Sequence, residues 1–219
     1  MHANRRPGLT RDIIIESGLR LLDEVGLEGL TVRRLAADLG VRSPALYWHF
    51  RTKQELLDGM ADAMVQGAGM GPPRTGESWR EWLERRARAY YESLLAHRDG
   101  ALVVVQARQL SPATMVRFNQ EIAGLVEQGF TPVLALHTIT AISHYVTGWA
   151  LQVQGASPAG QVEQPPHDHL EAVVQLLGSD APLLEAFRAE GGAWAESSFN
   201  HGLRVLLDGT AAALSRLAD

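Results

Sequence analysis

The sequence predicts an all-α protein, and three observations carry this prediction. Apolar residues recur every three or four positions through most of the 219 residues, which is the spacing of one helix face. No segment shows sustained apolar–polar alternation bounded by hairpin turns, as strands would. Serine or threonine precedes several apolar segments and glycine follows them, which is typical of helix starts and ends. We therefore expect an N-terminal three-helix domain and a larger helical domain after it.

Helix signals divide the first part of the chain into four segments. Thr10 and Thr31 are expected N-caps, since a threonine oxygen can accept from the free N–H groups of the first turn. Gly26 and Gly40 are expected to end these two helices. Pro44 suits the first turn of a third, short helix, where its missing N–H is not needed. The four expected helices are 10–25, 31–39, one that opens at 43–44, and 53–67.

The second part of the chain follows a stretch rich in glycine and proline, MVQGAGMGPPRTG at 64–76, which is the best candidate boundary. Beyond it we expect helices at 77–96, 111–129, 131–154, 168–177 and 195–217, a loop at 157–168, and a linker before the last helix. We assign residues 1–56 to the first domain and residues 57–219 to the second.

The composition is typical of a soluble globular protein, with 46% apolar residues, 21% charged residues and a net charge of −5. The absence of cysteine excludes disulfides, thiolate catalysis and cysteine-ligated zinc. The apolar run at 101–105 is far shorter than the roughly 20 residues of a membrane span. No apolar stretch follows the basic start MHANRRPGL, as a secretory signal would require. These observations favour a cytoplasmic protein that does not contact a membrane.

Two short helices joined by Gly40-Val41-Arg42 fit the helix-turn-helix pattern, whose second helix enters the major groove of DNA. Leu46 and Phe50 are four apart and should face the core, which leaves the aromatic residues 47–49 outward. Residues 1–56 carry nine basic and seven acidic side chains, whereas the remainder carries eleven and eighteen. This pattern favours DNA binding by the N-terminal end. A packing module whose aromatics fill a domain interface remains the alternative.

The residues TVRRLAADLGV at 31–41 and PALYWHF at 44–50 resemble the N-terminal domain of the TetR family of repressors. The body carries further stretches similar to the tetracycline repressors of that family: GESW at 76–79, LLAHRDGA at 94–101, EQGF at 127–130, and His144 followed by Gly148. The resemblance implies a homodimer that binds palindromic double-stranded operator DNA and responds to a small organic effector.

Carried over to this sequence, the resemblance implies that residues 43–45 meet bases and that Tyr47, His49 and Lys53 bond phosphates. Arg33 is expected to contact a base edge or a phosphate, and Arg42, like Arg34, to add electrostatic contacts. The full set of expected DNA-binding residues is Arg33, Arg42, Ser43, Pro44, Ala45, Tyr47, Trp48, His49 and Lys53.

The body has aromatic and polar residues, among them Trp149, inside helices that otherwise read as buried. Such residues suit a small-molecule cavity, although the polar faces of amphipathic helices explain them equally well. The resemblance places most of them at or beside the family's drug pocket. The expected ligand-binding residues are Tyr90, Val104, Arg108, Arg117, Glu121, His144, Trp149 and Gln152.

Val104 and Gln152 stand where the tetracycline repressors use a histidine and a glutamate to hold a drug–magnesium chelate. Valine has no ligand atom, and a neutral amide is a poor substitute for a carboxylate on a hard dication. We therefore expect no metal site, no cofactor, and an effector of another kind, either fairly apolar or planar and aromatic.

The helices at 132–154 and 195–217 are the expected dimer surface, since the family pairs the corresponding helices of two subunits. No catalytic constellation is evident: Ser197 and His201 are a helical i, i+4 pair without a nucleophile elbow, and His167 and His169 lie in a proline-rich loop. A helical enzyme or ligand carrier with a purely structural N-terminal unit is the competing hypothesis. An activator or a ligand-independent regulator also remains open.

Overall fold

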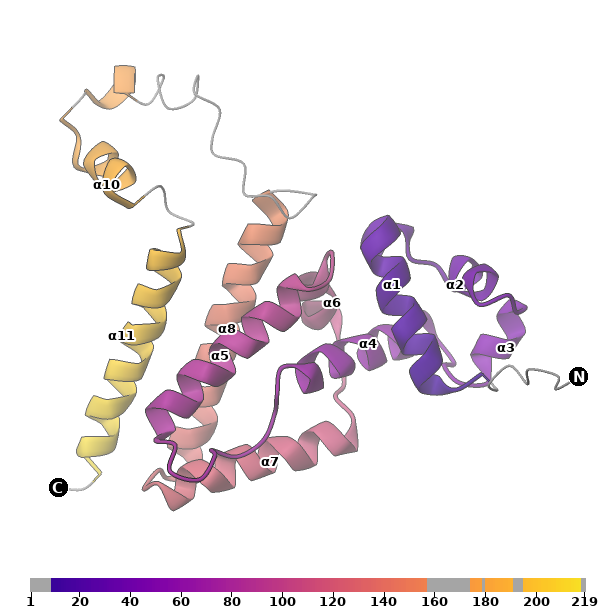
Figure 1. The fold of residues 1–219 in the computed structure, drawn as a ribbon, viewed down its shortest axis with the longest axis horizontal. Helices are drawn as coiled ribbons and strands as arrows, with labels where there is room; N and C mark the ends of the chain where they lie inside the picture. The colour runs from indigo at the N-terminus through magenta and orange to yellow at the C-terminus, as the bar shows by residue number, and fades with distance from the viewer. Residues whose placement is uncertain (1–8, 157–173, 179, 191–194, 218–219) are drawn as a thin grey trace, which may run out of the picture. The chain divides into compact units, whose positions relative to one another are not determined.

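The computed structural model describes residues 9–156, 174–178, 180–190 and 195–217. Within these ranges the chain consists of helices and connecting turns and contains no strand (Figure 1), which confirms the predicted all-α fold class. None of the helices in these ranges is both long enough and apolar enough to cross a membrane.

The chain forms two compact units, neither of which is continuous in sequence. The first holds the described residues up to Gly71 together with Ala89–Asn119. The second holds Pro72–Arg88 and the described residues from Gln120 onward. The chain passes between the units three times: once between Gly71 and Pro72, and twice inside a helix, in α5 (Trp79–Leu95) and in α7 (Pro112–Glu127).

The first unit opens with four helices that begin where the sequence predicts. They are α1 (Arg11–Gly29), α2 (Val32–Asp38), α3 (Ser43–Tyr47) and α4 (Lys53–Gly67). Thr10, Thr31 and Thr52 are N-caps, and each side-chain oxygen accepts from the N–H three residues further on. Gly26 has a φ of 70° and interrupts the regular helix as predicted, although one more turn continues to Gly29.

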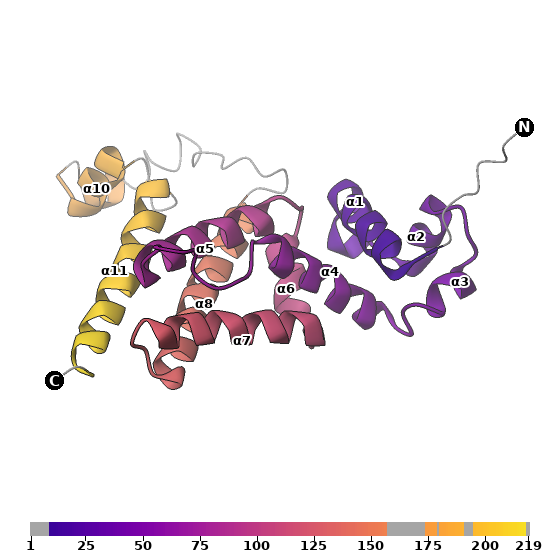
Figure 2. The same cartoon turned by 60° about the horizontal axis from the view of Figure 1, so that its bottom comes forward.

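The hydrophobic core of the first unit joins these helices. Ile14 of α1, Leu35 of α2 and Met60 of α4 are fully buried. Leu46 and Phe50, the residues expected to anchor α3, are buried in the same cluster. Because α3 has five residues, it cannot hold its shape alone, and this core fixes α1 to α3 around the N-terminal part of α4 (Figure 2).

A short helix that the sequence did not predict, α6 (Gly100–Gln106), completes the same core with the buried Val103. The sequence offers little indication of it, since it has seven residues, no side-chain cap and three consecutive valines, which lose side-chain freedom in a helix. Tertiary contacts fix its start instead. Asp99, at a φ of 56°, accepts from the Leu27 N–H of α1 at 2.8 Å.

The second unit holds the remaining parts of α5 and α7 together with α8 (Pro132–Ala156), α10 (Pro182–Glu190) and α11 (Glu196–Ser215). α8 and α11 lie against each other, and aromatic side chains of the two helices are in contact. The Tyr145 hydroxyl donates to the Phe199 carbonyl at 2.9 Å, and the two rings stack with centroids 5.6 Å apart. Gly202 lies directly beneath Tyr145, so α11 approaches α8 closely at this point.

The expected linker before the last helix is wrong over residues 182–190, which form α10. Pro182 in the first turn and the buried Leu184 explain why this short segment is helical. The expected loop at 157–168, together with His167 and His169, lies outside the described residues. The expected helix at 168–177 is described only from Val174, and residues 174–177 are helical.

Candidate functional site

The turn between α2 and α3 has a defined hydrogen-bond geometry. Gly40 has a φ of 66°, a left-handed conformation that glycine adopts without a Cβ penalty. Its N–H donates to the Ala37 carbonyl at 3.0 Å, and the Val41 N–H donates to the Ala36 carbonyl at 2.9 Å. This pair of bonds forms a Schellman motif, which satisfies the last carbonyls of α2 and directs the chain into α3.

α3 buries one side and exposes the other. Leu46 is buried, whereas Tyr47 and Trp48 are 50% and 89% exposed. The other expected contact residues of this segment are also accessible: Pro44 is exposed, and Ser43, Ala45 and His49 are half-buried. A tryptophan exposed to this degree gains nothing from burial in the monomer, so it points to a contact with another molecule.

Arg11, which the sequence pattern does not mark as part of the DNA-binding surface, holds the residues after α3 in place. Its guanidinium donates to the His49 carbonyl at 3.3 Å and lies 4.2 Å from the centroid of the Phe50 ring. A cation over an aromatic face is attracted to it, so both contacts tie the C-terminal end of α3 to the start of α1.

Three cations of the expected DNA-binding set are exposed: Arg33, Arg42 and Lys53. None of them makes a hydrogen bond or an ion pair through its side chain with another residue in the part of the chain that the structure describes. Arg34 differs, because its guanidinium donates to the Gly29 carbonyl at 3.3 Å and supports the end of α1. Cations without a partner in their own chain are available to phosphate groups.

One face of α4 carries a polar side chain at each turn. All four side chains bond to residues 106–114, which run from the end of α6 through the connection into the first turn of α7. The bonds run from Gln54 Nε2 to the Gln106 carbonyl (2.9 Å), from the Arg108 N–H to Asp58 Oδ1 (2.9 Å), from the Ser111 N–H to Asp62 Oδ1 (2.9 Å), and from Gln66 Nε2 to Thr114 Oγ1 (2.8 Å). We call this set the polar ladder. It fixes α4 to the connection that carries Arg108.

Asp62 is the most buried of the four α4 side chains in the ladder, with 9% exposure. Burial raises the pKa of its carboxyl group, but hydrogen bonds from Thr114, Ser111 and Gln66 outweigh burial and hold the pKa below its ordinary value. The carboxylate is therefore charged at neutral pH, and every partner is a donor that matches it.

The first unit holds four of the expected ligand-binding residues. Tyr90 of α5 is buried, and Val104 of α6 packs against the core shared by α1 to α4. Arg108 and Arg117 are exposed, and the backbone N–H of Arg108 belongs to the polar ladder. Val104 therefore offers an apolar contact to the first unit's core, whereas Arg108 is bonded to α4 through its backbone and its side chain is exposed.

The second unit holds the other four expected ligand-binding residues. Glu121 is fully buried and accepts from Arg86 Nε at 2.9 Å. Trp149 packs near Phe199 with ring centroids 5.8 Å apart, whereas His144 and Gln152 are exposed on α8. Arg86 was not among the expected residues, because the sequence pattern does not show which arginine pairs with a buried glutamate.

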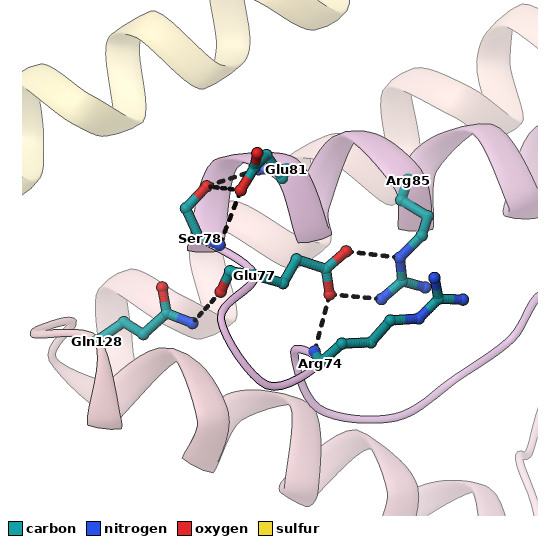
Figure 3. A network of polar contacts seen from close by, with 6 residues as sticks. All are labelled: Arg74, Glu77, Ser78, Glu81, Arg85 and Gln128. Carbon is teal, nitrogen blue, oxygen red and sulfur yellow. Dashed lines mark hydrogen bonds and ion pairs between the residues drawn. The ribbon is translucent and has the colours of Figure 1, made fainter.

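The start of α5 is held by the network in Figure 3. Arg85 donates from Nε and Nη2 to the two carboxylate oxygens of Glu77, at 2.7 and 2.8 Å, and the Arg74 N–H donates to the same carboxylate. The hydrogen bond from Arg85 lowers the pKa of Glu77 to about 2. Ser78 and Glu81 cap each other reciprocally, which explains the GESW motif as a helix start.

The residues at the expected magnesium positions do not fit the ion. Val104 has no donor atom and faces an apolar core, and Gln152 offers only an exposed neutral amide. No group of three or more His, Asp or Glu side chains in the described ranges is arranged to hold a metal ion.

Comparison with known proteins identifies both parts of the chain. Residues 14–60 match the family described as bacterial regulatory proteins, tetR family. Residues 72–214 match the domain described as tetracyclin repressor-like, C-terminal domain. The chain belongs to the TetR family. The predicted resemblance is thereby confirmed, and so is the organisation into an N-terminal helix-turn-helix unit and a larger C-terminal helical domain.

The relatives and structures agree with this assignment. The tetracycline repressor protein class A from transposon 1721 of Escherichia coli is 38% identical over 210 residues, covering 93% of this chain and 91% of that protein. The class A TetR structure in complex with 5a,6-anhydrotetracycline and magnesium has 33% identity and a TM-score of 0.68, and the match covers 93% and 99% of the two chains. The structure of BioQ with its natural double-stranded DNA operator has 25% identity and a TM-score of 0.63, with the same coverage.

As a TetR-family protein, this chain is a transcriptional regulator with a DNA-binding head and not an enzyme. The competing hypothesis of a helical enzyme or carrier finds no support among these similarities. The helix-turn-helix therefore has a function beyond packing.

Proposed function

We propose that this protein is a homodimeric repressor that binds palindromic operator DNA and leaves it when a small organic effector binds. In this proposal residues 1–56 form the DNA-binding domain, residues 57–219 form the effector-binding and dimerisation domain, and the protein acts in the cytoplasm. The observation that carries the proposal is the accessible surface around α3, where exposed aromatics adjoin cations that have no partner in the described chain.

In the proposed complex α3 enters the major groove, with Ser43, Pro44 and Ala45 against base edges. Tyr47, His49 and Lys53 bond the phosphates on either side, and Arg33 and Arg42 extend the cationic rim. Trp48 rests on the sugar–phosphate backbone. Arg11 supports this arrangement from within the N-terminal unit. Its guanidinium fixes the backbone of His49, and so the orientation of α3 relative to α1.

The effector is proposed to be an organic molecule bound without magnesium. The related class A TetR is known in complex with an anhydrotetracycline and magnesium, which supports a small-molecule site in this body. Here the residues at the metal-holding positions have no suitable donor, so the effector relies on organic contacts alone. The residues proposed to contact the effector are Tyr90, Val104, Arg108, Arg117, Glu121, His144, Trp149 and Gln152.

The polar ladder is the proposed route from effector to DNA. An effector that draws Arg108 toward itself pulls on the N–H that bonds Asp58, and so on α4. α4 begins at Lys53, directly after the recognition segment, and its tilt changes the separation of the two recognition helices in a dimer. Two half-sites about 34–36 Å apart tolerate little change of that separation. By linkage, DNA weakens effector binding by the same factor.

The proposed dimer surface lies on α8 and α11. Both helical segments present large apolar side chains to solvent. More than 40% exposed are Val133 and Leu136 on α8, Val205 on α11, and Leu217 just after α11. Exposed apolar residues on two adjacent helices favour burial against a second copy. A two-fold dimer also matches a palindromic operator.

The proposal is tested by random-site selection with the full-length protein. We expect enrichment of a palindromic duplex, and a footprint over two half-sites. Tyr47→Ala should weaken binding to that duplex by about 1–3 kcal/mol without changing the helical circular dichroism, because Tyr47 is half exposed. Tyr47→Phe separates the hydroxyl from the ring and should weaken binding less. A folded dimer that enriches no duplex contradicts the proposal.

A further inference from the structure

Two aspartates connect the end of α1 to the turn between α5 and α6, and all of these residues belong to the first unit. Asp23 of α1 accepts from the Arg98 N–H at 2.9 Å, and its two carboxylate oxygens lie 3.0 and 3.2 Å from His97 Nδ1. In the reverse direction, Asp99 accepts from the Leu27 N–H of α1 at 2.8 Å. Each side thus supplies a carboxylate that accepts from the other, and we call this reciprocal set of bonds the aspartate clasp.

Asp99 opens α6 with its backbone but gives its side chain to α1. Its carbonyl accepts from the Val103 N–H at 2.9 Å, whereas its carboxylate makes no capping bond to α6. Its φ of 56° is left-handed, and in the described part of the chain it is the only residue other than glycine with a positive φ. Aspartate tolerates this conformation at some cost in free energy, and such strain is concentrated at functional sites. The strained backbone is what directs the carboxylate of Asp99 toward α1.

The interruption of α1 supplies the N–H group that Asp99 bonds. Gly26 has a φ of 70°, and one further turn follows it. The Leu27 N–H lies at the start of that turn, where N–H groups have no acceptor within their own turn. A Cβ on Gly26 would lie 3.0 Å from Asp99 Oδ2 and 3.1 Å from Arg98 Nε, so a side chain at this position would crowd the clasp. Gly26 therefore both interrupts the helix and makes room for the turn between α5 and α6.

α6 is thereby bonded at both of its ends to helices of the N-terminal unit. The clasp joins its start to α1, and the Gln106 carbonyl at its end accepts from Gln54 of α4 at 2.9 Å. α1 precedes the helix-turn-helix in the chain and α4 follows it. Apolar burial has no direction, whereas hydrogen bonds have a defined geometry. One attachment would allow rotation about it, so the two attachments on different helices fix the orientation of the helix-turn-helix relative to α6.

We propose that Asp23 and Asp99 are positioning residues for operator binding. This inference rests on the proposed function, in which two copies of the chain bind a palindrome. By fixing the helix-turn-helix relative to α6, the clasp sets the separation of the two recognition helices, which must match the separation of the half-sites. Without the clasp the helix-turn-helix rotates more freely, and the dimer accepts a wider range of half-site separations.

The test compares two duplexes by fluorescence anisotropy with the full-length protein. One is the palindrome that wild type enriches in random-site selection, and the other has one base pair inserted at its centre. The insertion separates the half-sites by a further 3.4 Å or so and rotates them by about a tenth of a turn. We expect wild type to prefer the first duplex at least about tenfold.

Two variants open the clasp from opposite sides. Asp99→Gly should lower the preference for the first duplex by about three- to tenfold, a factor equivalent to one hydrogen bond. Glycine adopts the left-handed φ without strain, so this variant removes the carboxylate and keeps the backbone. Asp23→Ala should lower the preference by a similar factor. The preference is a ratio of two affinities measured on one sample, so a fraction of unfolded protein cancels from it.

Two control variants keep the clasp. Glu24→Ala removes the neighbouring carboxylate of α1, which is exposed and makes no side-chain hydrogen bond or ion pair with the described residues, and it should keep the wild-type preference. Asp99→Asn retains an acceptor oxygen for the Leu27 N–H and tolerates the left-handed φ, so it should restore most of the preference that Asp99→Gly loses.

The outcomes separate the clasp from the proposed function. If Asp99→Gly and Asp23→Ala bind both duplexes more weakly by the same factor, the clasp has only a structural role and the inference is overturned. An equal loss of preference in Glu24→Ala overturns it too. A wild type that binds both duplexes equally well overturns the inference alone, whereas a wild type that binds neither contradicts the proposed function and the inference with it.

Discussion

Asp62→Asn is the sharpest perturbation of the polar ladder, because it changes the group's chemistry and hardly its shape. The carboxylate accepts from the Ser111 N–H at 2.9 Å and from Gln66 Nε2 at 2.7 Å, and Thr114 bonds the same group. Every partner is a donor. An asparagine has only one acceptor oxygen, so its NH₂ group must face a donor in a site that is 9% exposed.

The magnitude follows from these contacts. Losing charge-assisted hydrogen bonds and leaving a buried donor unpaired costs about 2–3 kcal/mol of unfolding free energy. For a chain of this size that corresponds to a fall of about 4–12 °C in the melting temperature. Asp58→Asn is the matched control, since Asp58 is less buried and, within the described part of the chain, accepts hydrogen bonds from Gln54 and Arg108 alone. It should cost about half as much.

The pH dependence gives a second readout. The pKa of Asp62 is lower in the folded chain than its ordinary value of 3.8, so the charged carboxylate stabilises the fold above pH 3.8. This stabilisation is lost as the pH falls from there through the folded pKa. The gap in stability between wild type and Asp62→Asn should therefore close in acid. Urea titrations across pH measure it, and equal stability of the two proteins at pH 7 would refute the role given to the ladder.

Two further predictions concern the stability of the C-terminal domain and its binding of an effector. Glu77→Gln should lower the free energy of unfolding by about 1–3 kcal/mol, because Glu77 accepts two charge-assisted hydrogen bonds from Arg85. The contribution of the Glu77 carboxylate is present above pH 4.5 and is lost as the pH falls toward 2. The melting temperatures of the variant and of wild type should therefore converge in acid. Magnesium should not support effector binding, so a titration of anhydrotetracycline followed by tryptophan fluorescence should give the same curve with and without a chelator. Tight binding that a chelator abolishes would show that residues other than Val104 and Gln152 hold the ion.

The starts of the four N-terminal helices and the ends of α2 and α4 could be predicted because local chemistry decides them, whereas α1 runs one turn beyond its predicted end at Gly26. Thr10 and Thr31 are caps in the structure, and Gly40 takes the left-handed conformation that the turn requires. The exposure of Tyr47 and Trp48 followed from their spacing relative to Leu46. These features depend on residues that are neighbours in sequence, so the sequence pattern contains them.

Features that depend on distant partners could not be predicted in this way. α6 is held by the core that α1 and α4 form, and its valines alone do not favour a helix. Asp62 reads as a surface residue of a polar helix face, yet it is buried because residues 106–114 cover it. The pairing of Arg86 with Glu121 joins side chains 35 positions apart, and helical periodicity does not encode such pairs.

The salt dependence of operator binding tests the central claim most directly. Binding to the selected palindrome, followed by fluorescence anisotropy, should weaken steeply with salt, with a linear fall of log K against log salt concentration. Arg33→Ala should weaken binding and reduce that slope by about 1 for each phosphate that Arg33 neutralises, whereas Arg216→Ala, at the end of α11, should change neither quantity. A slope near zero would contradict the claim that the N-terminal helix-turn-helix unit binds DNA. The same slope and the same affinity for wild type and Arg33→Ala would contradict it as well.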